Sequence, residues 1–323
     1  MKRIYISEDI QNLAEEYRDN LFFSRNRNFQ SPKQLLEALH NQLKNKDYKK
    51  YVKNIIDHFD EILVLHPDKF ETYRKQYFDL DDNKLNSKRW KRRADESFAD
   101  AIVKAMRYED VRKQEIPRYI KKLGIKSCIY CNAQYTATVH KDKSTIGAYQ
   151  IDHFKPKSQY PFLCISFFNL QPCCANCNLW KSDTPVKFNL YTTDISDIDP
   201  FSFSLTDKSV IDYMLYQDVD KLEIHLNSTD KELLKNHNTV FHTQELYVNF
   251  NDEAEELLWK CKIYNNTYKE LLVNQFGKLF PHKKNDIQRL LFGFYNNLSD
   301  IHKRPLTKLK QDIVRQLVPL FKQ

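Results

Sequence analysis

Apolar residues recur at helical spacing along the first 120 residues of the chain. The stretch YVKNIIDHFDEILVL shows this most plainly. Serine caps helix starts well, so Ser7 before EDIQNLAEEYRDNLF and Ser31 before PKQLLEALHNQL predict the beginnings of two helices. Pro32, directly after Ser31, suits a first helical turn. The pattern therefore predicts a helical N-terminal region.

Beyond residue 120 the pattern changes to alternation and later returns to helical spacing. Residues 127–154 are rich in Tyr, Thr, Val and Ile and predict a short hairpin with Gly147 near its turn. Residues 169–182 are again helical in pattern, and residues 200–228 suggest strands of a second small hairpin. We therefore expect a mainly α protein with a small α+β core. The expected regions are residues 1–120, 121–190 and 191–323.

The composition narrows the classes of function. Gly occurs only 4 times in 323 residues, far below the usual share of about 7%. Neither GxGxxG nor GxxxxGK[ST] is present, so a nucleotide-hydrolysing protein is not expected. The net charge of +8 fits a polyanionic partner without requiring one.

The chain lacks the marks of a membrane or secreted protein. No apolar run is long enough to cross a bilayer, and MKRIYISEDIQNLAEEY turns acidic where a signal peptide would be apolar. We expect a cytoplasmic protein with no membrane association. In a reducing compartment its 7 cysteines would stay free, which favours metal binding over disulfides.

Four cysteines form two CxxC pairs, Cys128 with Cys131 and Cys174 with Cys177. Two thiolates on one tight turn can face one ion, and two such pairs complete a tetrahedral zinc site. Cys173 is also available, but the CxxC spacing selects Cys174. A redox-active CxxC is the alternative, and a second pair around one compact motif argues against it. We expect a structural Zn²⁺, because all four ligand positions are filled.

An aspartate, a histidine and two asparagines lie around the second cysteine pair, in QIDHFKPKSQYPFLCISFFNLQPCCANCNLWKSD. They are Asp152 and His153, then Asn169, then Asn178 directly after the last cysteine. The order DH…NL…CxxCNxxK, over roughly residues 125–185, resembles the HNH (ββα-metal) endonucleases. The resemblance implies a ββα-metal core, a β-hairpin followed by a helix, flanked here by helical N- and C-terminal regions.

The resemblance also implies roles for these residues. His153 would be the general base that activates water, and Asp152 with Asn178 would hold a catalytic Mg²⁺ or Mn²⁺. Adjacent strand residues point to opposite faces, so Asp152 and His153 can share one site only if the strand ends or bends there, as Pro156 allows. Asn169 would fix the loop around the histidine, or alternatively cap a helix.

Basic residues are candidates for contact with phosphate, the alternative being an ordinary solvated face. One group is a run of Lys and Arg around Trp90. Contact of this run with phosphate is favoured only if the run lies beside the nuclease site. A further candidate, Lys181, lies one turn after Asn178. By contrast, the Asp57-His58 pair lies in a helical pattern with no ligand companions, and we expect no site there. The candidate nucleic-acid-binding residues are Lys155, Lys181, Arg89, Lys91, Arg92 and Arg93.

The function expected from the resemblance is metal-dependent hydrolysis of nucleic acid, foremost DNA, leaving 5′-phosphate and 3′-hydroxyl ends. HNH nucleases with large helical additions resemble antiphage-defence effectors of the Septu or retron-associated kind, and restriction is a further setting. A regulatory protein partner such as an ATPase, or self-association, would explain the helical flanks. The alternative is a zinc-stabilised nucleic-acid-binding or scaffolding module that does not cleave.

Overall fold

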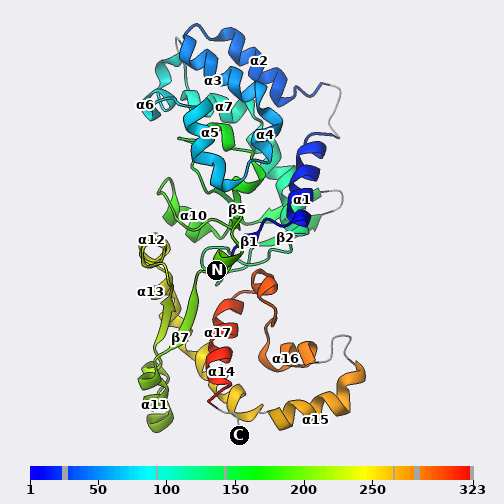
Figure 1. Ribbon diagram of the computed structural model, residues 1–323, viewed down its shortest axis with the longest axis vertical. Helices are drawn as coiled ribbons and strands as arrows, with labels where there is room; N and C mark the ends of the chain where they lie inside the picture. Colours follow the sequence, from blue (N-terminus) through cyan, green and yellow to red (C-terminus); the bar gives the residue numbers. More distant parts are fainter. Residues whose placement is uncertain (24–27, 92–93, 142–143, 265, 280–283, 321–323) are drawn as a thin grey trace.

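Helices dominate the fold, and short pairs of strands lie among them (Figure 1). The computed structural model describes the chain apart from residues 24–27, 92–93, 142–143, 265, 280–283 and 321–323. The molecule is elongated, with the helices of residues 32–105 at one end, shown in blue and cyan, and the last quarter of the chain towards the other, shown in orange and red; the N-terminus lies near the middle. The predicted mainly helical class with small sheets is confirmed.

The N-terminal region begins with helices that are capped as predicted. The Ile10 amide donates to Ser7 Oγ at 3.5 Å, and Ser31 forms a reciprocal capping box with Gln34. Both predicted helix starts are confirmed. The helices are α1 (Glu8–Asn20), α2 (Pro32–Gln42), α3 (Lys46–Asp57), α4 (Phe59–Leu63), α5 (Phe70–Tyr77), α6 (Asp82–Leu85), α7 (Phe98–Ala105), α8 (Tyr108–Asp110), a π-helical turn η3 (Val111–Glu115) and α9 (Ile116–Lys122).

Strands pair two by two in the part of the chain that the structure describes. One pair is parallel and joins the N-terminus to the end of the middle region, and the other pairs are antiparallel. The pairs are β1 (Ile4–Tyr5) with β6 (Tyr191–Thr192), β2 (Ala137–Lys141) with β3 (Ser144–Ala148), β4 (Gln150–His153) with β5 (Leu170–Cys173), and β7 (Ser202–Leu205) with β8 (Ile224–Asn227).

Three local predictions need correction. Gly147 lies inside β3 opposite Thr138, not at the turn. A glycine is needed there because the Tyr149 ring packs where a Cβ on Gly147 would stand. The segment predicted as helical from residue 169 is a strand up to Cys173, and its helix α10 spans only Ala175–Lys181. Pairing with β4 outweighs the helical pattern there. The second hairpin exists as β7–β8 but contains a helix, α11 (Asp207–Tyr216).

The C-terminal region is helical after β8, as predicted. Its last long helix, α17, packs against β7 and α14 and lies beside α14 in the lower half of Figure 1. No helix of the described residues is both long and apolar enough to cross a membrane. The helices are α12 (Lys231–Phe241), α13 (Thr243–Tyr247), α14 (Asn251–Ile263), α15 (Asn266–Phe276), α16 (Lys284–Phe292) and α17 (Thr307–Leu317).

The N-terminal helices hold the loop between β4 and β5. The Tyr17 hydroxyl donates to the Ile165 carbonyl at 2.8 Å. Phe78 stacks on Phe162 with ring centroids 4.0 Å apart. Buried aromatic contacts of this kind add to the free energy gained by burying the rings. The loop is therefore fixed by a region far away in the sequence.

Candidate metal and catalytic site

The four predicted cysteines meet in the fold. The Sγ atoms of Cys128, Cys131, Cys174 and Cys177 all lie within 4.8 Å of one another, and all four residues are buried. A tetrahedral zinc with Zn–S bonds of about 2.3 Å sets its sulfurs about 3.8 Å apart, and the sulfurs of Cys131 and Cys174 are 4.0 Å apart. This group can hold a metal such as zinc.

The turn that carries Cys128 and Cys131 is anchored by the C-terminal region. His237 Nε2 donates to the Tyr130 carbonyl at 3.0 Å, and the Tyr247 hydroxyl donates to the Cys131 carbonyl at 2.7 Å. These two contacts come from α12 and α13 and satisfy buried backbone acceptors. The C-terminal helices therefore fix the backbone of the turn that carries Cys128 and Cys131.

Asn132 completes this anchor. It adopts a left-handed backbone with φ of 52°, which Asn tolerates better than most residues. Its side chain donates to Ser127 Oγ at 2.8 Å and accepts from the Lys308 amide at 3.0 Å. Its carbonyl accepts from the Leu306 amide at 2.6 Å. The start of α17 is thus bonded directly to the turn that carries Cys128 and Cys131.

We predict that the buried His237 makes the fold sensitive to acid. Burial lowers the pKa of His237 from 6.5 to about 3, so below pH 6.5 only the unfolded chain takes up a proton there. Its contribution to stability is complete above pH 6.5 and falls as the pH drops, by roughly 2 kcal/mol at pH 5. His237→Gln, which keeps an amide donor, should lose less unfolding free energy between pH 7.5 and 5 in urea titrations.

The control for this prediction is His225→Gln, because His225 is exposed on β8. That variant should keep the acid sensitivity of the wild type. If His237→Gln lost as much stability as the wild type over this pH range, His237 would not be a source of the sensitivity.

Asp152, His153, Asn178 and Lys181 line one cleft of about 270 Å³. Asp152 and His153 end strand β4, and the chain bends directly after them at residues 154 and 155. Asn178 and Lys181 come from α10, which follows the partner strand β5 and packs on β4. An antiparallel strand pair followed by a helix therefore brings together residues that lie up to 29 positions apart.

His153 is held in one tautomer. Its Nε2 lies 2.9 Å from the Cys164 carbonyl, which can only accept, so Nε2 carries the proton and Nδ1 keeps a free lone pair. Burial and the charge of Lys157 lower the pKa of His153 to about 3. The Tyr108 ring packs on the imidazole with centroids 4.9 Å apart. The imidazole is therefore neutral and oriented.

Asp152 is buried and bonded at both oxygens. Lys181 Nζ lies 3.0 Å from its Oδ1, and the Tyr130 hydroxyl donates to its Oδ2. Lys181 also donates to the His153 carbonyl at 2.9 Å. Burial raises the pKa of Asp152, and these partners oppose that shift. Lys181 is thus a buried counter-ion of Asp152, not the solvated lysine that was one expectation for it.

Asn169 fixes the loop between the two strands. Its Nδ2 donates to the carbonyls of Lys155 and Leu163, each at 3.1 Å, and its Oδ1 accepts from the Lys155 amide at 2.7 Å. It directly precedes β5 and does not cap a helix. Its hydrogen bonds position the loop residue Cys164, whose carbonyl holds His153.

We predict that Lys181→Met destabilises the protein because it leaves Asp152 as an unpaired buried carboxylate. The side chains of Lys181 and Asp152 are only 1% and 8% exposed, and removal of one partner of such a pair costs about 3–5 kcal/mol. The double variant Asp152→Asn/Lys181→Met should regain most of that loss in urea titrations. If the double variant lost the sum of two independent single losses, the pair would not be coupled.

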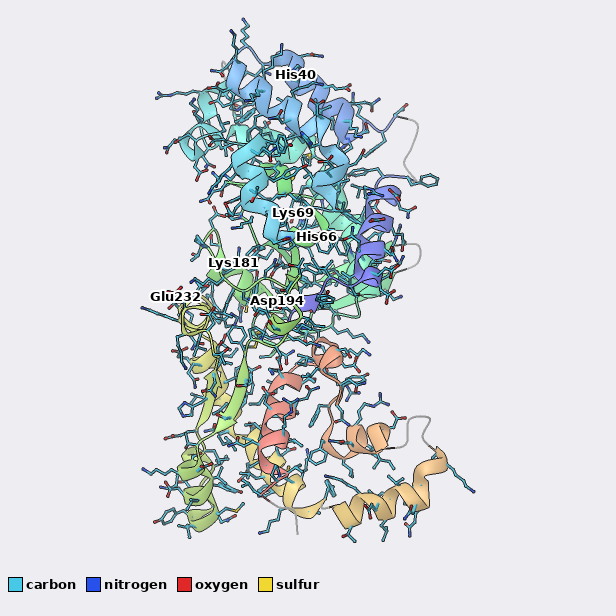
Figure 2. The ribbon with its side chains drawn as sticks, viewed as in Figure 1. His40, His66, Lys69, Lys181, Asp194 and Glu232 are labelled. Carbon is cyan, nitrogen blue, oxygen red and sulfur yellow. The ribbon has the colours of Figure 1, made fainter. Side chains whose placement is uncertain are left out.

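The control is Lys187→Met, which breaks the exposed ion pair between Lys187 and Glu232. Glu232 lies on α12 and is labelled in Figure 2. Exposed pairs contribute little, so this variant should unfold like the wild type.

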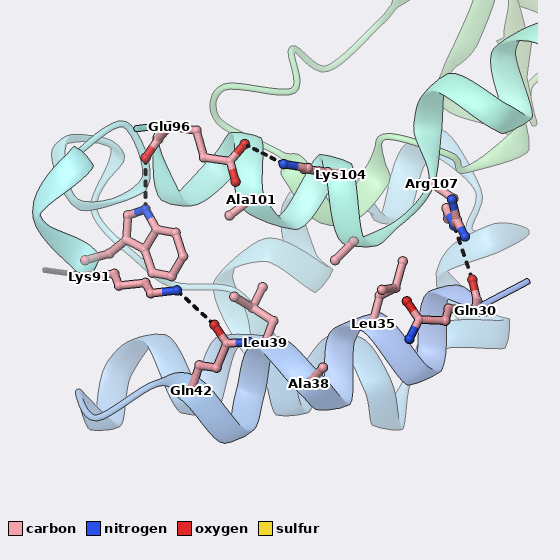
Figure 3. A pocket seen from close by; sticks show the side chains of 12 residues that line it. Gln30, Leu35, Ala38, Leu39, Gln42, Lys91, Glu96, Ala101, Lys104 and Arg107 are labelled. Carbon is pink, nitrogen blue, oxygen red and sulfur yellow. Dashed lines mark hydrogen bonds and ion pairs between the residues drawn. The ribbon is translucent and has the colours of Figure 1, made fainter. Parts of the chain in front are cut away.

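None of the other basic candidates in the described part of the chain lines the cleft of Asp152 and His153. Lys155 pairs with Glu71, and it is Lys157 that lines the cleft. Lys91 lines a separate cavity between α2 and α7, where it donates to Gln42 Oε1 at 3.0 Å (Figure 3). Arg89 is exposed on the short turn before it. Arg92 and Arg93 lie outside the described residues.

Several residues at the cleft were not predicted from the sequence. Tyr108 and Arg112, from the N-terminal region, and Lys157, directly after Pro156, line it. Tyr130, inside the first CxxC pair, is buried behind the cleft and donates to Asp152. Position within the motif was an available signal for Tyr130 and Lys157. No signal marked Tyr108 or Arg112, because they reach the cleft only through packing of α8 and η3.

Comparison with models of known protein families, with curated proteins and with solved structures gives no match in any of the three. Assignment of a function therefore depends on the residues of the cleft and of the cysteine group.

Proposed function

We propose that the chain is a metal-dependent endonuclease of the HNH type that hydrolyses phosphodiester bonds in nucleic acid, DNA foremost. The observation that carries the proposal is the cleft shared by Asp152, His153 and Asn178, beside a buried four-cysteine group. An acid, a neutral imidazole and an amide oxygen at one place are what hydrolysis with a hard cation needs.

In this proposal His153 is the general base. The Cys164 carbonyl holds the proton on Nε2, so Nδ1 can accept a proton from water as that water attacks phosphorus. The negative charge of a bound phosphodiester would stabilise the resulting imidazolium, and this offsets the low pKa that burial imposes on His153. Lys157 lines the same cleft and can contact the phosphate.

Asp152 and Asn178 would hold the catalytic cation, Mg²⁺ or Mn²⁺. Both residues line the cleft and carry side-chain oxygens, the ligand atoms that these ions prefer. The Asn178 Oδ1 lies 3.9 Å from Cys173 Sγ. The two bonds to Lys181 and Tyr130 leave lone pairs on the Asp152 carboxylate, so the donor set fits such an ion. A bound cation would take up the charge that develops on the phosphate oxygens. The four cysteines would hold a structural zinc that fixes α10 against the first turn.

The test is a cleavage assay with Mg²⁺ or Mn²⁺ on double-stranded DNA, single-stranded DNA and RNA, with His153→Ala alongside. We expect plasmid nicking and linearisation by the wild type, dependent on the added metal and absent from His153→Ala. Equal cleavage by both proteins would remove His153 from the mechanism. Nucleic-acid binding without cleavage under any of these conditions would favour a zinc-stabilised binding or scaffolding module instead.

A further inference from the structure

A second cavity adjoins the cleft. It has a volume of about 460 Å³, within the range of about 300–1,000 Å³ that is usual for ligand sites. Strand β3 and Tyr149 form one wall, and η3 with α9 forms the other. Pro117, Ile146 and Tyr149 give it apolar and aromatic lining, and Lys113 stands at its polar side. A flat apolar ring with a nearby negative charge would suit this lining.

The two cavities adjoin along the start of β4. Arg112, Gln150 and Ile151 line both of them. The Arg112 guanidinium donates to Glu109 through Nη2 at 3.0 Å. Its Nε is buried and has no hydrogen-bond partner among the residues that the structure describes. The rest of the side chain is accessible, because Arg112 lines both cavities and is 38% exposed, so its guanidinium can contact a ligand at this junction.

The aromatic wall is fixed in place by Gly147. A Cβ on this residue would lie 2.6 Å from Cζ of Tyr149, so the ring packs directly on the glycine backbone. The Tyr149 hydroxyl also lies 3.4 Å from Thr138 Oγ1 on β2. The ring is thus held at the cavity by the hairpin and does not move freely, which reduces the entropy cost of stacking a ligand on it.

We propose that this second cavity holds the unstacked base of the nucleotide next to the cleaved phosphodiester, and that Arg112 contacts the phosphate between them. The inference rests on the proposed nuclease function, which places the phosphate in the adjoining cleft. Stacking of a base on an aromatic side chain contributes about 1–3 kcal/mol. An unbroken duplex keeps its bases stacked inside, so the substrate class that fits is single-stranded or locally unpaired nucleic acid.

The experiment measures binding by fluorescence anisotropy, in the full-length His153→Gln background so that the probe is not cut. The probes are labelled oligothymidylate, the same sugar–phosphate chain without bases, and duplex DNA of matched length. Tyr149→Leu removes the ring, and Ile146→Glu places a negative charge in the cavity. Val139→Glu is the matched control, because Val139 pairs with Ile146 across β2–β3 and both are 49% exposed, but Val139 does not line the cavity.

We expect the base-free chain to bind about tenfold more weakly than oligothymidylate, as loss of stacking predicts. Tyr149→Leu and Ile146→Glu should each weaken oligothymidylate binding by about tenfold, and Val139→Glu by less than about twofold. Equal binding of the two single-stranded probes, unchanged binding by both cavity variants, tighter binding of duplex, or no binding at all would overturn the proposal. Circular dichroism checks that each variant is folded.

Cleavage by the otherwise wild-type protein, assayed in parallel, separates this inference from the proposed function. Metal-dependent cleavage together with unchanged binding by the cavity variants would refute the base site and leave the nuclease standing. The expected binding pattern without any cleavage would leave the base site standing and refute the nuclease.

Discussion

His153→Gln should lower the rate of metal-dependent cleavage by a factor of about 10²–10⁴, the usual contribution of a general base. Glutamine can still donate to the Cys164 carbonyl, the bond that His153 makes at 2.9 Å, but it has no basic nitrogen. The loop and the cleft should therefore persist while proton transfer is lost. His153→Ala removes the hydrogen bond as well, so it should lose activity and some stability. Initial rates of plasmid nicking and urea unfolding measure the two effects.

The control for this variant is His58→Gln. His58 belongs to the chain's other Asp-His pair and lies at the end of α3, where it packs on Tyr77 with ring centroids 4.2 Å apart. It lines no part of the cleft, so the variant should cleave at the wild-type rate. A similar loss of rate in both variants would show that the effect of His153→Gln is not specific to the cleft.

Cys128→Ser and Cys177→Ser should abolish stable folding of the protein. Structural zinc contributes about 10–16 kcal/mol of apparent binding free energy in small zinc domains, which is comparable with the roughly 5–15 kcal/mol that stabilises a typical protein. We expect one zinc per chain by elemental analysis, and loss of soluble protein or of the thermal transition in both variants. A strong chelator should have the same effect on the wild type.

Cys261→Ser is the matched control, because Cys261 is also buried but lies on α14 outside the cysteine group. It should stay soluble and keep its zinc. Active, folded wild-type protein that contained no metal at the cysteines would contradict the assignment of a structural zinc. Loss of zinc with retained folding in Cys128→Ser would show that the C-terminal anchor alone holds this turn.

Loss of a zinc from the cysteine group would also affect the cleft that Asp152 lines. Tyr130 lies between Cys128 and Cys131, and its hydroxyl donates to Asp152. Its carbonyl accepts from His237 at 3.0 Å. The same turn therefore carries two of the four cysteines and contacts both Asp152, the proposed cation ligand, and the C-terminal helices. Movement of the C-terminal helices would displace this turn and with it the Tyr130 hydroxyl that donates to Asp152.

Local chemistry in the sequence determined the parts of the protein that depend on near neighbours. Ser7 and Ser31 predicted their helix starts, because capping is a hydrogen bond over three residues. The CxxC spacing predicted the cysteine group, because two thiols on one turn face the same side. The mainly helical class followed from the spacing of apolar residues.

Only the tertiary structure decided what depends on packing between distant segments. Lys181 contacts Asp152 and not solvent because of the way α10 packs on β4. The sequence of α10 by itself does not determine that packing. Nothing in the sequence distinguishes Lys155 from Lys157. In the fold Lys155 pairs with Glu71 of a distant helix, whereas Lys157 lines the cleft. Tyr108 reaches His153 from the N-terminal region. Burial and charge pairing arise only when the segments meet, and they set the chemistry of the site.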